Sequence, residues 1–119
     1  MPDDQEPVLN KQAALELCND DEDLFLEIVQ AYLEDAMEHS KYLLYALEAG
    51  DAHQVEERAH ALKGASFNIC AGPVREAAQI LGKAGRIEDL SEAAQLYKVF
   101  KKEFKRLFEH LNTLPPPSS

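Results

Sequence analysis

The sequence has little that would build β-structure, and residues that break helices are absent from its long middle stretches. Runs of β-branched residues are few, and alternation of apolar and polar residues with a period of two is almost missing. The six prolines are confined to the two ends and to Pro73, which leaves the stretches between them free to be helical. Since 45% of the residues are apolar and recur periodically, these patterns predict an all-α fold with a real core.

Signals for export, membrane insertion and metal ribbons are also lacking. The acidic start of the chain contains no apolar stretch of the kind that secretory signals carry. No segment approaches the roughly 18 apolar residues that span a bilayer. The two cysteines, Cys18 and Cys70, lie far apart and form no C-x-x-C pair, which argues against a zinc ribbon or a redox pair. We therefore expect a cytoplasmic protein.

Positive charge is scarce. Twelve lysines and arginines stand against 22 acidic residues, which gives a net charge of −10. Such a field repels the phosphates of nucleic acids and of anionic lipids. We expect neither nucleic acid nor membrane as a partner.

The length of 119 residues fits one domain. We place this domain at residues 8–114 and expect residues 1–7 and 115–119 to be flexible termini, because both are polar or rich in proline. These ends are compatible with a free-standing protein and with a domain of a larger one.

Five helices follow from the apolar periodicity and the capping signals. A short helix spans about Asn10 to Cys18, with Leu9, Ala13 and Leu17 on one side. The four longer helices have these boundary signals: the acidic residues 20–23 and Gly50; a capping box of Asp51 and Gln54; Gly72 with Pro73 at the first helical position; and a capping box of Asp89 and Glu92. Short connections between amphipathic helices favour an up-down antiparallel four-helix bundle with a short extra N-terminal helix.

The third helix carries the most informative residues. Its apolar seam, spaced by threes and fours, consists of Ala52, Val55, Ala59, Leu62, Ser66 and Ile69. At about 100° per residue, His60 lies roughly 120° from the centre of that seam. His60 is therefore expected to project into solvent, where another protein can reach it.

Three neighbours distinguish this histidine from an ordinary surface residue. Lys63 follows one turn later and can offset negative charge beside the imidazole. Gly64 costs about 1 kcal/mol of helix propensity relative to alanine, a cost that bare space for a partner's backbone would explain. Ser66 falls in the apolar seam, where its hydroxyl needs a partner.

The segment from His60 to Asn68, HALKGASFN, resembles the signature of the histidine phosphotransfer (HPt) family. The resemblance extends over nearly the whole chain. It implies that His60 is the phosphoryl acceptor, Lys63 its electrostatic support, Gly64 the docking space and Ser66 a structural hydroxyl.

Two positions depart from the family pattern. Cys70 stands where the family usually has glycine, which bears on the turn into the fourth helix. Gly82 stands where the family often has an amide or a carboxylate that orients the imidazole. Gln79, one turn earlier, is the candidate to take over that function.

The resemblance further implies a phosphocarrier of two-component phosphorelays rather than an enzyme. Its partners would be a response-regulator receiver domain and a sensor or hybrid histidine kinase. Mg²⁺ and the reacting aspartate would belong to the receiver, and the carrier itself would need no cofactor. The sequence has no Gly-rich phosphate loop, and no helix has a second apolar face, so we expect a monomer that does not bind ATP.

Blander explanations remain for parts of the pattern. His39, His53 and His110 are expected to be solvated surface residues. Glu57 and His60 match the Glu-x-x-His element of di-iron bundles, but those sites need a second such element, which is missing. A helical docking or adaptor module that is never phosphorylated stays open as the alternative function.

Overall fold

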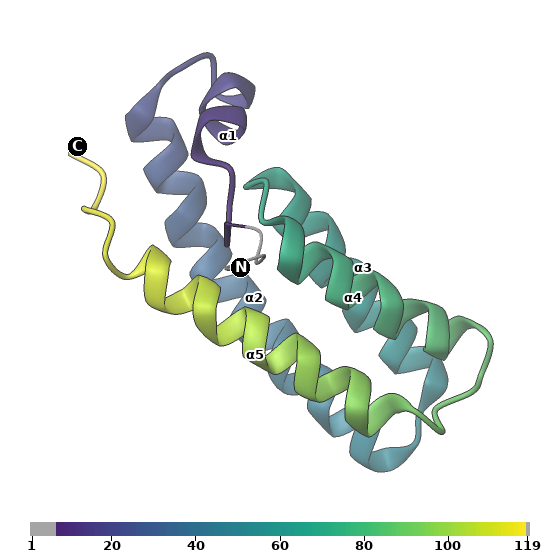
Figure 1. Ribbon diagram of the computed structural model, residues 1–119. Coiled ribbons are helices and arrows are strands. Elements are labelled where there is room, and N and C mark those ends of the chain that lie inside the picture. Colours follow the sequence, from purple (N-terminus) through teal and green to yellow (C-terminus); the bar gives the residue numbers. More distant parts are fainter. Residues whose placement is uncertain (1–6, 119) are drawn as a thin grey trace, which may run out of the picture.

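The computed structural model describes residues 7–118, which form five α-helices and no strand. The helices are α1 (Lys11–Leu17), α2 (Glu22–Ala49), α3 (Ala52–Asn68), α4 (Gly72–Arg86) and α5 (Ala93–Leu111) (Figure 1). The predicted all-α class is confirmed, and so are the five helices. The expected flexible residues 1–6 and 119 lie outside the described part of the chain.

Helices that follow one another in the sequence also pack against one another. The closest packing joins α3 and α4, followed by α2 with α3 and α4 with α5, whereas α2 and α5 approach less closely. Short connections return the chain alongside the preceding helix at each step (Figure 1). This order makes α3 and α4, which carry the predicted site, the most tightly joined pair.

Gly85 explains how α3 and α4 can come so close. A Cβ atom at this position would lie 2.7 Å from both the carbonyl oxygen of Ala52 and the amide nitrogen of Glu56. Both are backbone atoms of the first two turns of α3, so no side-chain rotation could relieve the overlap. The absence of a side chain at residue 85 therefore sets the spacing of the two helices.

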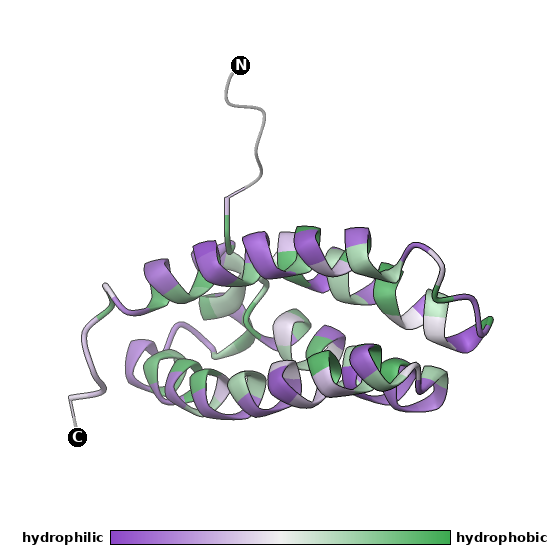
Figure 2. Ribbon diagram, turned by 90° about the horizontal axis from the view of Figure 1, so that it is seen from below, coloured by the Kyte–Doolittle hydropathy of each residue, from purple (hydrophilic) through white to green (hydrophobic). Residues whose placement is uncertain are grey.

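The core is built from the apolar stripes that the spacing predicts. Apolar and polar segments alternate along each long helix (Figure 2), as expected for amphipathic helices. On α5, Phe100 and Phe104 are buried and their rings stack with centroids 5.1 Å apart. Phe108 continues the row at 4.5 Å from Phe104 and lies 6.4 Å from the ring of Tyr32 on α2. Aromatic side chains thus bridge the pair of helices whose backbones approach less closely.

The turn after α3 keeps its geometry although it lacks the glycine usual in the family. Cys70 adopts a left-handed φ of 58°, which glycine tolerates and other residues seldom adopt. The amide of Ala71 donates to the carbonyl of Ser66 at 2.9 Å, and that of Cys70 donates to Phe67 at 3.0 Å. These two bonds are the pattern of a Schellman motif. Gly50, with a φ of 69°, ends α2 in the same left-handed conformation, as predicted.

Two of the predicted helix caps need correction. Asp51 accepts a hydrogen bond from the amide nitrogen of Gln54 at 3.1 Å, but the reciprocal half of the capping box is missing. The side chain of Gln54 donates to Glu57 instead, and the amide of Asp51 is already bonded to the carbonyl of Ala46.

The second capping box, at α5, is wrong. The carboxylate of Asp89 accepts from the amide and hydroxyl of Ser91, at 3.1 and 2.7 Å, and so closes a local turn before the helix. The helix begins later, at Ala93, with Glu92 as an N-cap whose side chain makes no capping bond. Pro73 is the second residue of α4, not the first.

The apolar side of α1 also differs from the prediction. Ala14 is buried, whereas Leu17 is 63% exposed. Leu9 is buried but precedes the helix, so helical spacing does not link it to Ala13 and Leu17. The buried residues at this end therefore come from the flanks of α1 as much as from the helix itself.

At the other end, residues 115–118 have no regular structure. The amide and hydroxyl of Ser118 donate to the carboxylate of Asp23 at 3.2 and 2.6 Å, which holds that carboxyl's pKa below its usual value. The domain bounds of 8–114 and the flexibility of the tail stay predictions. Within residues 7–118, no helix combines the length and apolar character needed to cross a membrane.

Candidate functional site

Burial of one face of α3 places His60 on the other. Five of the six predicted seam residues are buried and Ala52 is partly buried; the buried ones are Val55, Ala59, Leu62, Ser66 and Ile69. His60 follows Ala59 directly and is exposed. The helical register thus turns the imidazole outward, as predicted, while the residue before it anchors the helix in the core.

The two residues that flank the imidazole one turn later leave it accessible. Lys63 is half-buried and lines the same groove as His60. Gly64 is exposed, and a Cβ atom there would meet nothing within 4 Å. Packing inside the domain therefore does not require glycine at residue 64, and its bare backbone faces solvent next to the histidine.

Ser66 is tied into the core rather than into the groove. Its side chain is fully buried, and its hydroxyl shares a hydrogen bond of 2.9 Å with the hydroxyl of Tyr32 on α2. This bond satisfies two polar atoms that would otherwise be buried without partners. Burial raises the pKa of Tyr32 to about 12, against a smaller lowering from Ser66. The phenol therefore stays protonated under ordinary conditions.

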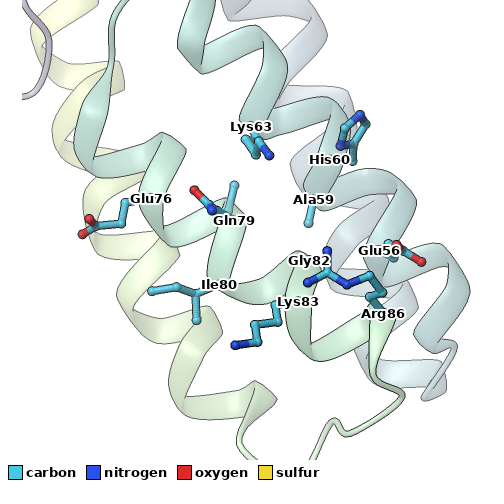
Figure 3. A pocket seen from close by; sticks show the side chains of 11 residues that line it. Glu56, Ala59, His60, Lys63, Glu76, Gln79, Ile80, Gly82, Lys83 and Arg86 are labelled. Carbon is cyan, nitrogen blue, oxygen red and sulfur yellow. The ribbon is translucent and has the colours of Figure 1, made fainter.

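The exposed side of His60 opens onto a groove of about 390 Å³ between α3 and α4. His60 and Lys63 stand on the α3 side, and Gln79 and Gly82 lie on the α4 side (Figure 3). The groove is therefore formed where the two most closely packed helices meet, and it brings four of the sequence-selected positions together.

The proposed substitute for the missing orienting group does not reach the imidazole. Gln79 is exposed, and no hydrogen bond joins it to His60 in the part of the chain that the structure describes. Gly82 has a backbone position whose Cβ would lie 3.4 Å from the Cβ of Ala59, an ordinary contact distance. The α4 side of the groove is thus left open beside His60.

Sequence reasoning missed two cations at this groove, Lys83 and Arg86, which line it from the last turn of α4. Their spacing from Gly82, one and four residues later, is the signal that could have found them, since residues four apart on a helix are neighbours.

His39 and His53 have partners, so neither is simply solvated as expected. Nδ1 of His39 lies 3.1 Å from the guanidinium of Arg58 on the other flank of α3, and that guanidinium stacks 4.7 Å from the ring of Tyr42. Nε2 of His53 lies 3.3 Å from the carboxylate of Glu57. Residues 7–118 contain no group of three His, Cys, Asp or Glu side chains arranged to hold a metal ion.

Comparison with known proteins agrees with the geometry. The family model of the Hpt domain matches residues 27–114. The crystal structure of histidine-containing phosphotransfer protein B from Pseudomonas aeruginosa PAO1 resembles this one with a TM-score of 0.83 and 26% sequence identity, over 92% of this chain and 95% of that one. A search of curated proteins returned no significant match.

Because the family model covers most of the chain, the chain belongs to the Hpt domain family. It is a histidine phosphocarrier of phosphorelay signalling. Proteins of this family exchange phosphoryl groups with receiver domains and histidine kinases.

Proposed function

We propose that His60 is the residue on which this phosphocarrier holds the phosphoryl group. The observation that carries the proposal is its exposed imidazole on the rim of the α3–α4 groove, with Lys63 lining the same groove. The ring of His60 has no hydrogen-bond or ion-pair partner within residues 7–118. A nucleophilic nitrogen needs such freedom and access.

The other histidines are weaker candidates. His39 and His53 have ring nitrogens engaged by Arg58 and Glu57. His110 is exposed near the end of α5, away from the H-x-x-K-G pattern that the family signature requires. Only His60 combines an open ring with that pattern.

The transfer step follows from the chemistry of imidazole and acyl phosphates. The unprotonated ring nitrogen attacks the phosphorus of a phospho-aspartate, an N–P bond forms, and the P–O bond to the aspartyl carboxyl breaks. The carboxylate leaves with the electron pair, and the proton on the other ring nitrogen exchanges with solvent. The second transfer reverses these events toward another aspartate. Such displacement depends on alignment and charge neutralisation more than on covalent assistance.

Lys63 and Gly64 serve this step in different ways. The ammonium of Lys63 offsets the charge of the phosphoryl group. The bare backbone at Gly64 leaves room for the receiver domain to bring its aspartate within reach. Ser66 acts at a distance, since its bond to Tyr32 fixes the register of α3 against α2.

The finer features of the protein are part of the same proposal. The four long helices form an up-down antiparallel bundle with α1 as the short extra helix, which the packing of consecutive helices supports. The carrier works as a monomer in the cytoplasm, between a receiver domain and a sensor or hybrid kinase. It needs no cofactor and has no ATP-binding or autokinase motif, and Mg²⁺ belongs to the receiver.

The test is phosphotransfer from a panel of phosphorylated receiver domains to the purified chain. Wild type and His110→Gln should acquire an acid-labile, alkali-stable label, and His60→Gln should acquire none. Circular dichroism of the His60→Gln protein should match wild type, since the side chain is exposed. A label that persists in a folded His60→Gln protein would reject His60 as the acceptor.

A further inference from the structure

The groove beside His60 is rich in cations for a protein whose net charge is −10. Lys63 lines it from α3, and Lys83 and Arg86 line it from α4. Glu56 and Glu76 also border the groove, yet none of the three cations forms an ion pair with them or with any other described residue. Positive side chains are therefore held near one another without the carboxylate partners that are plentiful elsewhere on the surface.

Arg86 and Lys83 extend in different directions although they share the last turn of α4. In Figure 3 the guanidinium of Arg86 folds back along α4 and lies over Gly82, on the side of the groove toward Ala59 and His60. The side chain of Lys83 extends away from His60. Only Arg86 thus occupies the space that the absence of a side chain at Gly82 leaves open.

Cations in the last turn of a helix have a general explanation, because they complement the negative end of the helix macrodipole. That explanation applies equally to Lys83 and Arg86. It does not account for a guanidinium that turns back over Gly82, and this difference allows the two effects to be separated experimentally.

We propose that Arg86 is a phosphoryl-binding residue, which engages the oxygens of the phosphoryl group on His60 from the α4 side while Lys63 does so from the α3 side. The inference rests on the proposed function of His60. A phosphoryl group carries nearly two negative charges and three acceptor oxygens, so the single ammonium of Lys63 leaves charge and acceptors unmatched. A guanidinium offers a planar fork of donors that suits two phosphoryl oxygens at once.

This assignment also accounts for Gly82. The family position that often carries an imidazole-orienting group has no side chain here, and the adjoining guanidinium fills the gap with a different chemistry. Arg86 would hold the phosphoryl group after transfer rather than orient the ring before it.

The experiment uses phosphoramidate, a small donor that requires no docking surface on a receiver domain. The ring nitrogen of His60 attacks its phosphorus, an N–P bond forms, and the original P–N bond breaks to release ammonia, which takes up a proton. Phosphohistidine is followed by ³¹P nuclear magnetic resonance in wild type, Arg86→Gln, Arg86→Lys and the matched control Lys83→Gln.

Arg86→Gln should slow phosphorylation about three- to tenfold, the size of one partly solvated charge-assisted contact. It should also raise the apparent pKa read from the pH dependence of the ³¹P shift by about one unit, because a nearby cation favours the more negative form of the group. Arg86→Lys should recover most of both effects, and Lys83→Gln should match wild type. Both glutamine variants remove one cation from the same helix end, so their thermal stabilities should agree.

Equal rates and equal ³¹P titrations in Arg86→Gln, Lys83→Gln and wild type would overturn the role of Arg86 while leaving His60 as the acceptor. Equal losses in the two glutamine variants would also overturn it, in favour of general electrostatics. A label that survives His60→Gln would instead reject the proposed acceptor, and the inference with it.

Discussion

Tyr32 on α2 and Ser66 on α3 share a hydrogen bond of 2.9 Å between their hydroxyls inside the core. Both side chains are buried, and neither has a solvent-exposed alternative. Ser66 lies six residues, less than two helical turns, after His60 on the same helix. The bond therefore fixes the rotation and height of the helix that presents the phosphoryl acceptor.

Removal of either hydroxyl should leave the other without its partner. We expect Tyr32→Phe and Ser66→Ala each to lower the free energy of unfolding by about 1–3 kcal/mol, the usual cost of an unsatisfied buried polar group. The double variant should lose less than the sum of the two, because no orphaned hydroxyl remains. Urea unfolding of the four proteins measures this coupling. Additive losses would show that the two hydroxyls act independently.

The same tyrosine predicts how stability depends on alkaline pH. Burial raises the pKa of Tyr32 to about 12 from a model value of 10.0. Below pH 10 both folded and unfolded chains keep the phenolic proton, so its contribution is fully present. Between about pH 10 and 12 only the unfolded chain loses the proton, and the folded state loses about 2.7 kcal/mol of relative stability over two pKa units.

The measurement is the free energy of unfolding of wild type and Tyr32→Phe between pH 9 and 11. Wild type should lose stability more steeply with rising pH than the phenylalanine variant. Tyr97 remains in both proteins, and burial raises its pKa as well, so the variant should keep part of the slope. Parallel curves would argue against the high pKa of Tyr32.

Much of this arrangement could be predicted from the sequence, because helical periodicity is a repeated signal. The seam of α3 is defined by several residues spaced by threes and fours, so a single error would not rotate the helix, and the exposure of His60 followed from it. The end of α2 at Gly50 was also predictable, since one residue type is strongly preferred in that conformation.

Features that depend on a single local choice were less predictable. Asp89 could cap a helix or close a turn with Ser91, and the sequence contains both options. The cation at Arg86 was missed for another reason. Its relation to His60 joins two helices, and its meaning depends on the missing side chain at Gly82 and on the direction in which a long side chain folds.

Cys70 offers a test of how the turn after α3 tolerates a residue other than glycine. Its left-handed φ of 58° costs roughly 1–2 kcal/mol in a residue with a Cβ atom. We expect Cys70→Gly to be more stable than Cys70→Ala by about 1 kcal/mol. Alanine is the proper reference because both variants lose the partly buried thiol. Thermal unfolding provides the comparison, and equal stabilities would mean that the turn relaxes its backbone in the alanine variant.

Gly64 separates stability from docking. Since a Cβ there meets nothing within 4 Å, Gly64→Ala should stabilise the protein by about 0.5–1 kcal/mol through helix propensity. Phosphorylation by phosphoramidate should stay near the wild-type rate, because that donor is small. Transfer from a receiver domain should slow about tenfold or more, as expected where a misplaced approach costs alignment. A bulkier Gly64→Gln should slow the receiver reaction further. Unchanged transfer from receivers in both variants would show that residue 64 is not docking space.

Gly85 and Gly82 form a matched pair on the groove side of α4. A Cβ at residue 85 would lie 2.7 Å from backbone atoms of Ala52 and Glu56, so Gly85→Ala should push α3 and α4 apart and cost about 1–3 kcal/mol of stability. A Cβ at residue 82 would meet only the Cβ of Ala59 at 3.4 Å, so Gly82→Ala should be neutral or stabilising by up to about 1 kcal/mol.

The two variants also predict opposite effects on chemistry. Separation of the helices in Gly85→Ala moves the α4 wall away from His60, so phosphorylation by phosphoramidate should slow under conditions where the protein is still folded. Gly82→Ala keeps the wall in place and adds only a methyl group beneath Arg86. Unfolding curves and ³¹P-monitored rates on the same samples test both statements. If Gly85→Ala proved as stable and as reactive as Gly82→Ala, the close approach of α3 and α4 could not be what positions the cations of the groove around the imidazole.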